Sequence, residues 1–154
     1  MKIATEIGDR CVEGAAYGNL GTAYHSLGNY RRAIDYHEKS LKVAMQIGDQ
    51  HLEGTAYGNL GNAYQLLGNY RKAVEYHEKQ LKIAIEVGDR GVEGTASFLL
   101  GVAYYSLCNY RKAIECLEKS MKIAIEIGDQ GGDCLLYTSP SPRDLSTSRM
   151  PSSA

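Results

Sequence analysis

The sequence predicts an all-α solenoid built from antiparallel helix pairs, and three observations lead to this prediction. First, the chain repeats itself with a period of 40 residues, because 25 of the 40 residues in 8–47 recur at the same place in 48–87. Second, apolar residues inside each copy recur at steps of three and four, the spacing of one helix face. Third, a glycine followed by asparagine or aspartate interrupts that spacing at regular intervals. A period of this length is typical of stacked repeats.

The period divides the chain into complete and incomplete copies. They are the end of a truncated preceding repeat at 1–7, full repeats at 8–47, 48–87 and 88–127, and the start of a truncated repeat at 128–133. Met1 occupies the place of Met121, in the middle of a helix. We therefore expect a natural protein that is longer at both ends.

The first helix of each copy is defined by an apolar stripe, which the second copy shows most clearly. The members of the stripe there are Ala56, Leu60, Ala63, Tyr64 and Leu67. Gly68 and Asn69 follow it. Glycine closes a helix in the left-handed conformation, and asparagine caps the next helix through its side chain. We expect a turn at these two residues.

The second helix of each copy carries its own stripe and ends at a glycine–aspartate pair. In the second copy we expect this stripe to contain Ala73, Val74, Tyr76, Leu81, Ala84 and Ile85. Gly88 closes the helix and Asp89 caps the following one. Neither helix can bury its apolar face alone, so the two are expected to pack as an antiparallel pair.

A glycine also recurs inside the first helices, as Gly21, Gly61 and Gly101. An interior glycine costs about 1 kcal/mol relative to alanine. Its repetition therefore predicts a close approach between helices, where any Cβ would collide.

The motif residues of the second copy resemble the tetratricopeptide repeat (TPR). They are Tyr57, Leu60, Gly61, Tyr64, Gly68, Tyr70 and Ala73, with tyrosine in the usual place of tryptophan. The third copy departs from the pattern, because Ser97 replaces the first aromatic residue and Cys108 replaces the turn glycine. The long period resembles that of G-protein-signalling-modulator (Pins/LGN-like) scaffolds and of large TPR proteins with a caspase-like domain. The resemblance implies a TPR superhelix.

The periodicity stops at Cys134, where the chain continues as CLLYTSPSPRDLSTSRMPSSA. This segment resembles the translation of an adapter used in sequencing-library preparation. A native disordered tail rich in serine and proline is the alternative. We expect residues 134–154 to be a disordered, adapter-derived tail that is not part of the fold.

Charge and composition argue against several classes of partner. The 17 basic and 18 acidic side chains and a pI near 6.4 give no electrostatic attraction for nucleic acid or for an anionic membrane. The sequence has neither a transmembrane run nor a signal-peptide pattern. Its four cysteines are scattered, which favours a reduced chain over a disulfide framework or a zinc site. We expect a cytoplasmic protein without metal, cofactor, nucleic-acid or membrane partners.

No catalytic pattern fits the sequence, so we expect no enzymatic activity. The glycine-rich phosphate-binding motifs do not occur. His37 and His77 each precede a glutamate, as in the HExxH metal motif, but leucine replaces the second histidine. Both histidines are expected to be helix-surface or packing residues. Cys108 and Cys116 are expected to be free thiols.

Surface for binding remains, and the resemblance locates it. In TPR proteins the first helices line the concave wall of the superhelix. The candidate partner-binding residues on this wall are Asn19, Thr22 and His25, then Asn59, Asn62 and Gln65, and finally Phe98, Leu99 and Tyr105. Asparagine amides pair with both groups of an extended peptide backbone, and the apolar trio provides an anchor site. The structural alternative is that asparagines bridge adjacent repeats and that Leu99 belongs to the core.

The sequence thus predicts a protein–protein interaction scaffold that binds peptide segments of partner proteins in its concave groove. One alternative is a regulatory array attached to an effector domain, such as a caspase-like domain, outside this sequence. Another is a structural array that associates with itself through exposed repeat ends.

Overall fold

The structure is a computed structural model that describes residues 2–131, and it describes side chains from residue 8 to residue 128. The expected tail at 134–154 lies outside the described residues. Within them the chain forms six α-helices and no strands, which confirms the all-α prediction. The helices are α1 (Lys2–Ser26), α2 (Tyr30–Ile47), α3 (Gln50–Leu66), α4 (Tyr70–Val87), α5 (Arg90–Ser106) and α6 (Tyr110–Gly131).

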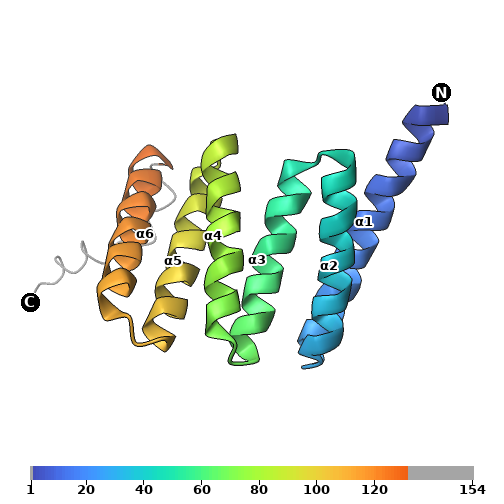
Figure 1. The fold of residues 1–154 in the computed structure, drawn as a ribbon. Helices are drawn as coiled ribbons and strands as arrows, with labels where there is room; N and C mark the ends of the chain where they lie inside the picture. The colour runs from blue at the N-terminus through green and yellow to red at the C-terminus, as the bar shows by residue number, and fades with distance from the viewer. Residues whose placement is uncertain (1, 132–154) are drawn as a thin grey trace, which may run out of the picture.

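The helices stack one after another, each antiparallel to the next, so that α1 and α6 form the two ends of the array (Figure 1). Each helix packs against its neighbours in sequence, and α3 also contacts α1. A hydrogen bond joins α3 to α5. The odd-numbered helices therefore form one connected surface, which we call the odd-helix surface.

The turns inside the helix pairs follow the predicted chemistry. Gly68 has a φ of +84°, and the Asn69 side chain accepts a hydrogen bond from the backbone N–H of Lys72 at 3.3 Å. Between pairs, Gly88 has a φ of +78° and the Asp89 carboxylate accepts from the Val92 N–H at 3.0 Å. Both cap predictions are confirmed. Each cap satisfies a backbone donor that the helix leaves unpaired.

The same glycine–aspartate pair has a different conformation at the ends of the array. Helix α1 continues through Gly8 and Asp9, and α6 continues through Gly128 and Asp129. Local sequence alone therefore does not fix this turn.

The core lies between helices and consists mainly of small and branched side chains. Leu60 and Ala63 of α3 are fully buried against Ile34 of α2, with Leu41, Tyr64 and Tyr76 packed around them. Leu67, expected in the first stripe, lies at the helix end and is 40% exposed.

The expected stripe of α4 is wrong at one position. Ile85 is 51% exposed, whereas Ile83 is buried, together with His77 and Gln80. The buried face of α4 is therefore rotated toward residues that the stripe left out. The polar members of this face were missed because their burial depends on glycines across the helix pair rather than on their own hydropathy.

The repeated interior glycines do mark close helix approaches, as predicted. A Cβ on Gly21 would lie 2.6 Å from Cε1 of the buried His37 ring. In the third copy a Cβ on Gly101 would lie 2.7 Å from Cγ of Leu117. Since His37 and His77 are buried over these glycines, they are packing residues.

Candidate partner-binding surface

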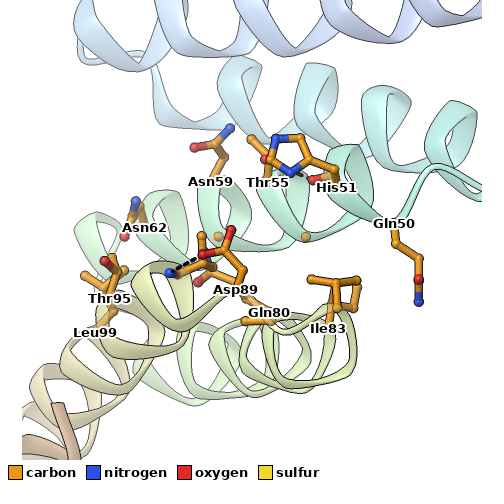
Figure 2. A pocket seen from close by; sticks show the side chains of 15 residues that line it. Gln50, His51, Thr55, Asn59, Asn62, Gln80, Ile83, Asp89, Thr95 and Leu99 are labelled. Carbon is orange, nitrogen blue, oxygen red and sulfur yellow. Dashed lines mark hydrogen bonds between the residues drawn. The ribbon is translucent and has the colours of Figure 1, made fainter. Parts of the chain in front are cut away.

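A cavity opens on the odd-helix surface where α3 and α5 meet over α4. It has a volume of about 190 Å³. Figure 2 shows His51, Thr55 and Asn59 along α3, with Asn62 of the same helix beside Thr95 and Leu99 of α5. Helix α4 closes the floor with Gln80, Ile83, Ala84 and Val87.

The two asparagines on the wall are positioned by the helix period. Asn59 and Asn62 are three residues apart on α3, so their amides project from the same side of the helix. Both are half-buried and line the cavity. A half-buried amide offers donors and an acceptor while losing few rotamers when a ligand binds, which favours it as a recognition group.

The cavity is lined mainly by apolar atoms, with amide and hydroxyl groups among them, and it carries little charge. Its carboxylate, on Asp89, already accepts the N–H of Val92 as the cap of α5. Thr55 donates its hydroxyl to the His51 carbonyl at 3.0 Å, and Thr95 donates to the Gly91 carbonyl at 3.1 Å. Among the lining residues in the described part of the chain there is no lysine or arginine. The cavity thus provides amides, hydroxyls and apolar atoms rather than an ionic clamp.

The predicted binding residues fall into separate groups. Asn59, Asn62 and Leu99 come together at the cavity. Gln65 instead donates to the Ser106 hydroxyl at 3.1 Å, so it bridges adjacent repeats. Phe98 lines a different hollow between α5 and α6, and Tyr105 is exposed and meets Tyr110 edge to face, with ring centroids 5.4 Å apart.

The candidates on α1 lie outside the cavity. Asn19 is exposed. Thr22 is also exposed and donates its hydroxyl to the Gly18 carbonyl at 3.0 Å. The His25 ring packs edge to face on Tyr30 at 5.1 Å between centroids. The structure therefore groups the second and third copies around one cavity and leaves the first copy apart from it.

Several cavity residues were not predicted from the sequence. His51, Thr55 and Thr95 line it, and Gln80 and Ile83 form part of its floor. The threonines had a detectable signal, because they occupy equivalent positions of the second and third copies where the first copy has Ala15. No sequence signal pointed to Gln80 and Ile83, because only the first helix of each repeat was expected to line the concave wall.

Stacked tyrosines stabilise the helix pairs that carry the cavity. The Tyr64 and Tyr76 rings stack at 5.6 Å, and Lys79 lies 5.8 Å from the Tyr76 centroid. The pKa of Tyr76 is raised, mainly because the side chain is partly buried.

In the third copy Cys116 replaces this tyrosine. There Tyr104 donates to the Glu78 carboxylate at 3.0 Å, and burial together with that carboxylate raises the pKa of Tyr104 to about 12.

Other kinds of site were sought in the same part of the chain. Cys11, Cys108 and Cys116 are free thiols, as expected for the last two. Within the described residues no three His, Cys, Asp or Glu side chains come together as ligands of a metal ion would. No helix of the described range combines the length and the apolar character needed to cross a membrane.

The stacked antiparallel pairs define a helical-repeat protein, and comparison with known proteins specifies its kind. The tetratricopeptide repeat family model matches residues 12–84 and 52–126. The chain therefore belongs to the tetratricopeptide repeat family. Repeats of this family generally mediate protein–protein interactions, and their fold is typically a non-enzymatic scaffold. No curated protein matches the chain significantly.

Solved structures share the fold. The TPR domain of Arabidopsis FLU is 21% identical with a TM-score of 0.71, over 73% of this chain and 95% of that one. BtubC from P. vanneervenii is 22% identical with a TM-score of 0.73, over 82% and 53%. A STAND signal-transduction ATPase with a tetratricopeptide repeat sensor, from Pyrococcus horikoshii, is 29% identical with a TM-score of 0.72, over 83% and 20%. This chain thus spans about half of BtubC and a fifth of the ATPase.

Proposed function

We propose that the chain is a scaffold that binds an extended peptide segment of a partner protein along the odd-helix surface. The observation that carries the proposal is the cavity in which Asn59 and Asn62 of one repeat face Leu99 of the next. Amides on one wall suit a peptide backbone, and the apolar side chain on the other suits an apolar anchor of the ligand.

The composition of the cavity also favours one class of ligand. With no lysine or arginine among its described lining residues, the cavity offers no counter-charge for a terminal carboxylate or a phosphate group. We therefore expect an internal, uncharged segment with an apolar residue. Phe98 and Tyr105, which are exposed further along α5, are proposed to extend the contact beyond the cavity.

The proposal is tested by selecting binders from a displayed library of random peptides on the whole chain and measuring their affinity by calorimetry. Asn59→Ala combined with Asn62→Ala is expected to weaken the selected peptides by about 1–3 kcal/mol, because each substitution removes hydrogen bonds to the ligand. The thermal midpoint of the double variant should stay close to that of the wild type, since both residues are only half-buried.

A matched double substitution on the even-numbered helices serves as the control. Lys42→Ala with Lys82→Ala removes two exposed side chains that lie away from the cavity. It is expected to leave the affinity unchanged. A library that yields no binder, or binders whose affinity the asparagine variant does not change, contradicts the proposal.

Two other roles remain as candidates. A regulatory array joined to an effector domain is favoured by the ATPase neighbour, whose repeats are described as a sensor. The resemblances to Pins/LGN-like scaffolds and to caspase-linked TPR proteins likewise depend on which domain accompanies the repeats. Sequencing the native transcript beyond the third repeat tests both resemblances, and it also tests the adapter origin of residues 134–154. A self-associating array is the third candidate, favoured by apolar side chains exposed on α1 and α6.

A further inference from the structure

Gln80 stands at a position where the other two repeats have a serine with a structural role. Ser40 donates its hydroxyl to the Gly14 carbonyl at 3.0 Å, and Ser120 donates to the Gly94 carbonyl at 2.9 Å. Each of these bonds ties the second helix of a repeat to the first. In the described part of the chain Gln80 makes no bond of this kind, and its side chain lines the floor of the cavity instead.

The amide of Gln80 is held on one side by His77, three residues earlier on α4. The Nδ1 atom of His77 lies 3.3 Å from Oε1 of Gln80, and both side chains are buried. Burial lowers the pKa of His77, so the ring is neutral at neutral pH and carries a single proton. An amide oxygen only accepts hydrogen bonds, so in this arrangement the proton is on Nδ1. Turning the amide around would set its NH2 group against that N–H, donor against donor.

Gly58 of α3 provides the space for the other end of the amide. A Cβ built on Gly58 would collide with Nε2 of Gln80. At the equivalent Gly18 of the first copy, a Cβ would lie at an ordinary 3.5 Å from Oγ of Ser40. The longer side chain on α4 thus fills the space above a glycine that lines the same cavity.

The NH2 group is the part of Gln80 that is left for a ligand. Among the described residues, the side-chain hydrogen bond of Gln80 is made through its oxygen, to His77. Around the amide the cavity is mostly apolar, with Ile83 beside it on the floor and Leu99 on the wall. A donor in such surroundings is costly to leave unpaired, so it favours a ligand that brings an acceptor.

We propose that Gln80 is a third recognition amide of the cavity, which donates its NH2 group to a neutral carbonyl oxygen of the bound segment, and that His77 is the positioning residue that holds the amide in this orientation. The inference rests on the proposed peptide-binding function and specifies which chemical group of the segment reaches the floor. A carboxylate is disfavoured there, because Asp89 lines the same cavity and would repel it. The carbonyl belongs either to the main chain of the segment or to a side-chain amide.

The first test measures, by calorimetry, how tightly peptides selected on the whole chain bind to variants of Gln80. Gln80→Met keeps an unbranched side chain of similar length without the amide, and it is expected to weaken binding about 10-fold, the usual worth of one neutral hydrogen bond. Gln80→Glu keeps an oxygen for His77 but replaces the donor by a second acceptor. It should weaken binding more than Gln80→Met does, because its oxygen repels the carbonyl of the ligand.

Gln46→Met is the matched control. Gln46 is an exposed glutamine on α2, the second helix of the preceding repeat, and it does not line the cavity. The control should bind the peptides like the wild type. Thermal unfolding of every variant shows whether the fold is kept, so that a loss of affinity is assigned to the cavity.

The positioning role of His77 is tested through Gln80. His77→Leu removes the N–H, and leucine already occupies the equivalent place as Leu117 against Gly101. The freed amide then populates both orientations, so binding should weaken about 2- to 5-fold. In the Gln80→Met background the same substitution should have no further effect on affinity. A role of His77 in packing alone would instead give the same loss in both backgrounds.

Variants of the peptide identify the carbonyl. Thioamide replacements weaken the acceptor at one peptide bond at a time, and alanine replacements remove side-chain amides one at a time. One of these replacements should weaken binding to the wild type about 10-fold and leave binding to the Gln80→Met chain unchanged. A backbone carbonyl and a side-chain amide are thereby distinguished.

The outcomes separate this inference from the function on which it rests. Peptides that are weakened by Asn59→Ala with Asn62→Ala, but bind Gln80→Met as tightly as the wild type, overturn the role of Gln80 alone. Coupling of Gln80 to an acidic side chain of the peptide, or to no carbonyl at all, overturns the ligand chemistry. An equal effect of His77→Leu in both backgrounds overturns its positioning role. A library that yields no binder overturns the proposed function and this inference together.

Discussion

The imidazole of His77 lies directly against Gly61, so that a Cβ on the glycine would fall 2.6 Å from Cε1 and from Nε2 of the ring. His77 is buried and its Nδ1 is 3.3 Å from Oε1 of Gln80, which is buried beside it. The whole residue is only 1% exposed, so a Cβ on Gly61 would force a buried ring to shift. Glycine here is a packing requirement between α3 and α4, and the same relation joins Gly21 to His37.

Gly61→Ala is therefore expected to destabilise the chain by about 1–3 kcal/mol, the usual cost of overpacking a core. The control is Gly18→Ala, another helical glycine, where a Cβ would lie 3.5 Å from Oγ of Ser40, an ordinary contact. That variant should gain up to about 1 kcal/mol from the better helix propensity of alanine. Urea unfolding followed by circular dichroism measures both. Equal effects of the two substitutions would contradict this account of Gly61.

The buried histidines predict a loss of stability in mild acid. Burial, helped by the nearby His25, lowers the pKa of His37 to about 4, and burial also lowers the pKa of His77. The unfolded chain takes up protons from a pKa near 6.5, so between about pH 6.5 and 4 it binds more protons than the folded chain. Stability therefore falls as the pH falls through this window, by up to about 3 kcal/mol for His37.

Replacing the two histidines tests this pH dependence. The third copy has Leu117 against Gly101 at the equivalent place, so leucine fits this site. His37→Leu with His77→Leu should reduce the loss of unfolding free energy between pH 7 and pH 5 seen in urea titrations. His51→Leu, at an exposed histidine, should leave it unchanged. An unaltered slope in the double variant would mean that other groups cause the acid sensitivity.

Cys108 occupies a turn position that suits glycine. Its φ is +64°, where the first two copies have Gly28 at +82° and Gly68 at +84°. A side chain costs energy in this region and glycine does not, so Cys108→Gly should stabilise the chain by about 1 kcal/mol. The reverse change, Gly68→Cys, should destabilise it by a similar amount. Thermal unfolding compares the two, and shifts of the same sign would refute the explanation.

A buried hydroxyl ties the helices of the first repeat together. Ser40 is 1% exposed and donates to the Gly14 carbonyl at 3.0 Å. Ser40→Ala should cost about 1 kcal/mol of unfolding free energy, because the hydrogen bond is lost in a buried place. Ser120→Ala, which removes the equivalent but less buried bond to Gly94, should cost less. Ser26→Ala, at an exposed serine, is the control and should have no effect.

Much of the fold was predictable because its determinants are local. The Asn69 and Asp89 caps and the left-handed glycines before them depend on residues within one turn of the chain, and a period of 40 residues repeats them. The candidate site was predictable only in part. Asn59 and Asn62 share a helix face, but the meeting of α3 with α5 and the floor supplied by Gln80 required the stacking of whole repeats.

The sequence by itself determined the period, the helix pairs and the caps inside the array, since each follows from short-range hydrogen bonding and helix periodicity. Only the tertiary structure decided where burial departs from the apolar stripes that the sequence predicts. Ile85 is exposed while His77 is buried, because burial depends on the residues across the helix pair. The pair at Gly8 and Asp9 stays helical whereas Gly88 and Asp89 turn. The same dipeptide therefore has two backbone conformations, because short-range hydrogen bonding is compatible with a continued helix and with a capped turn.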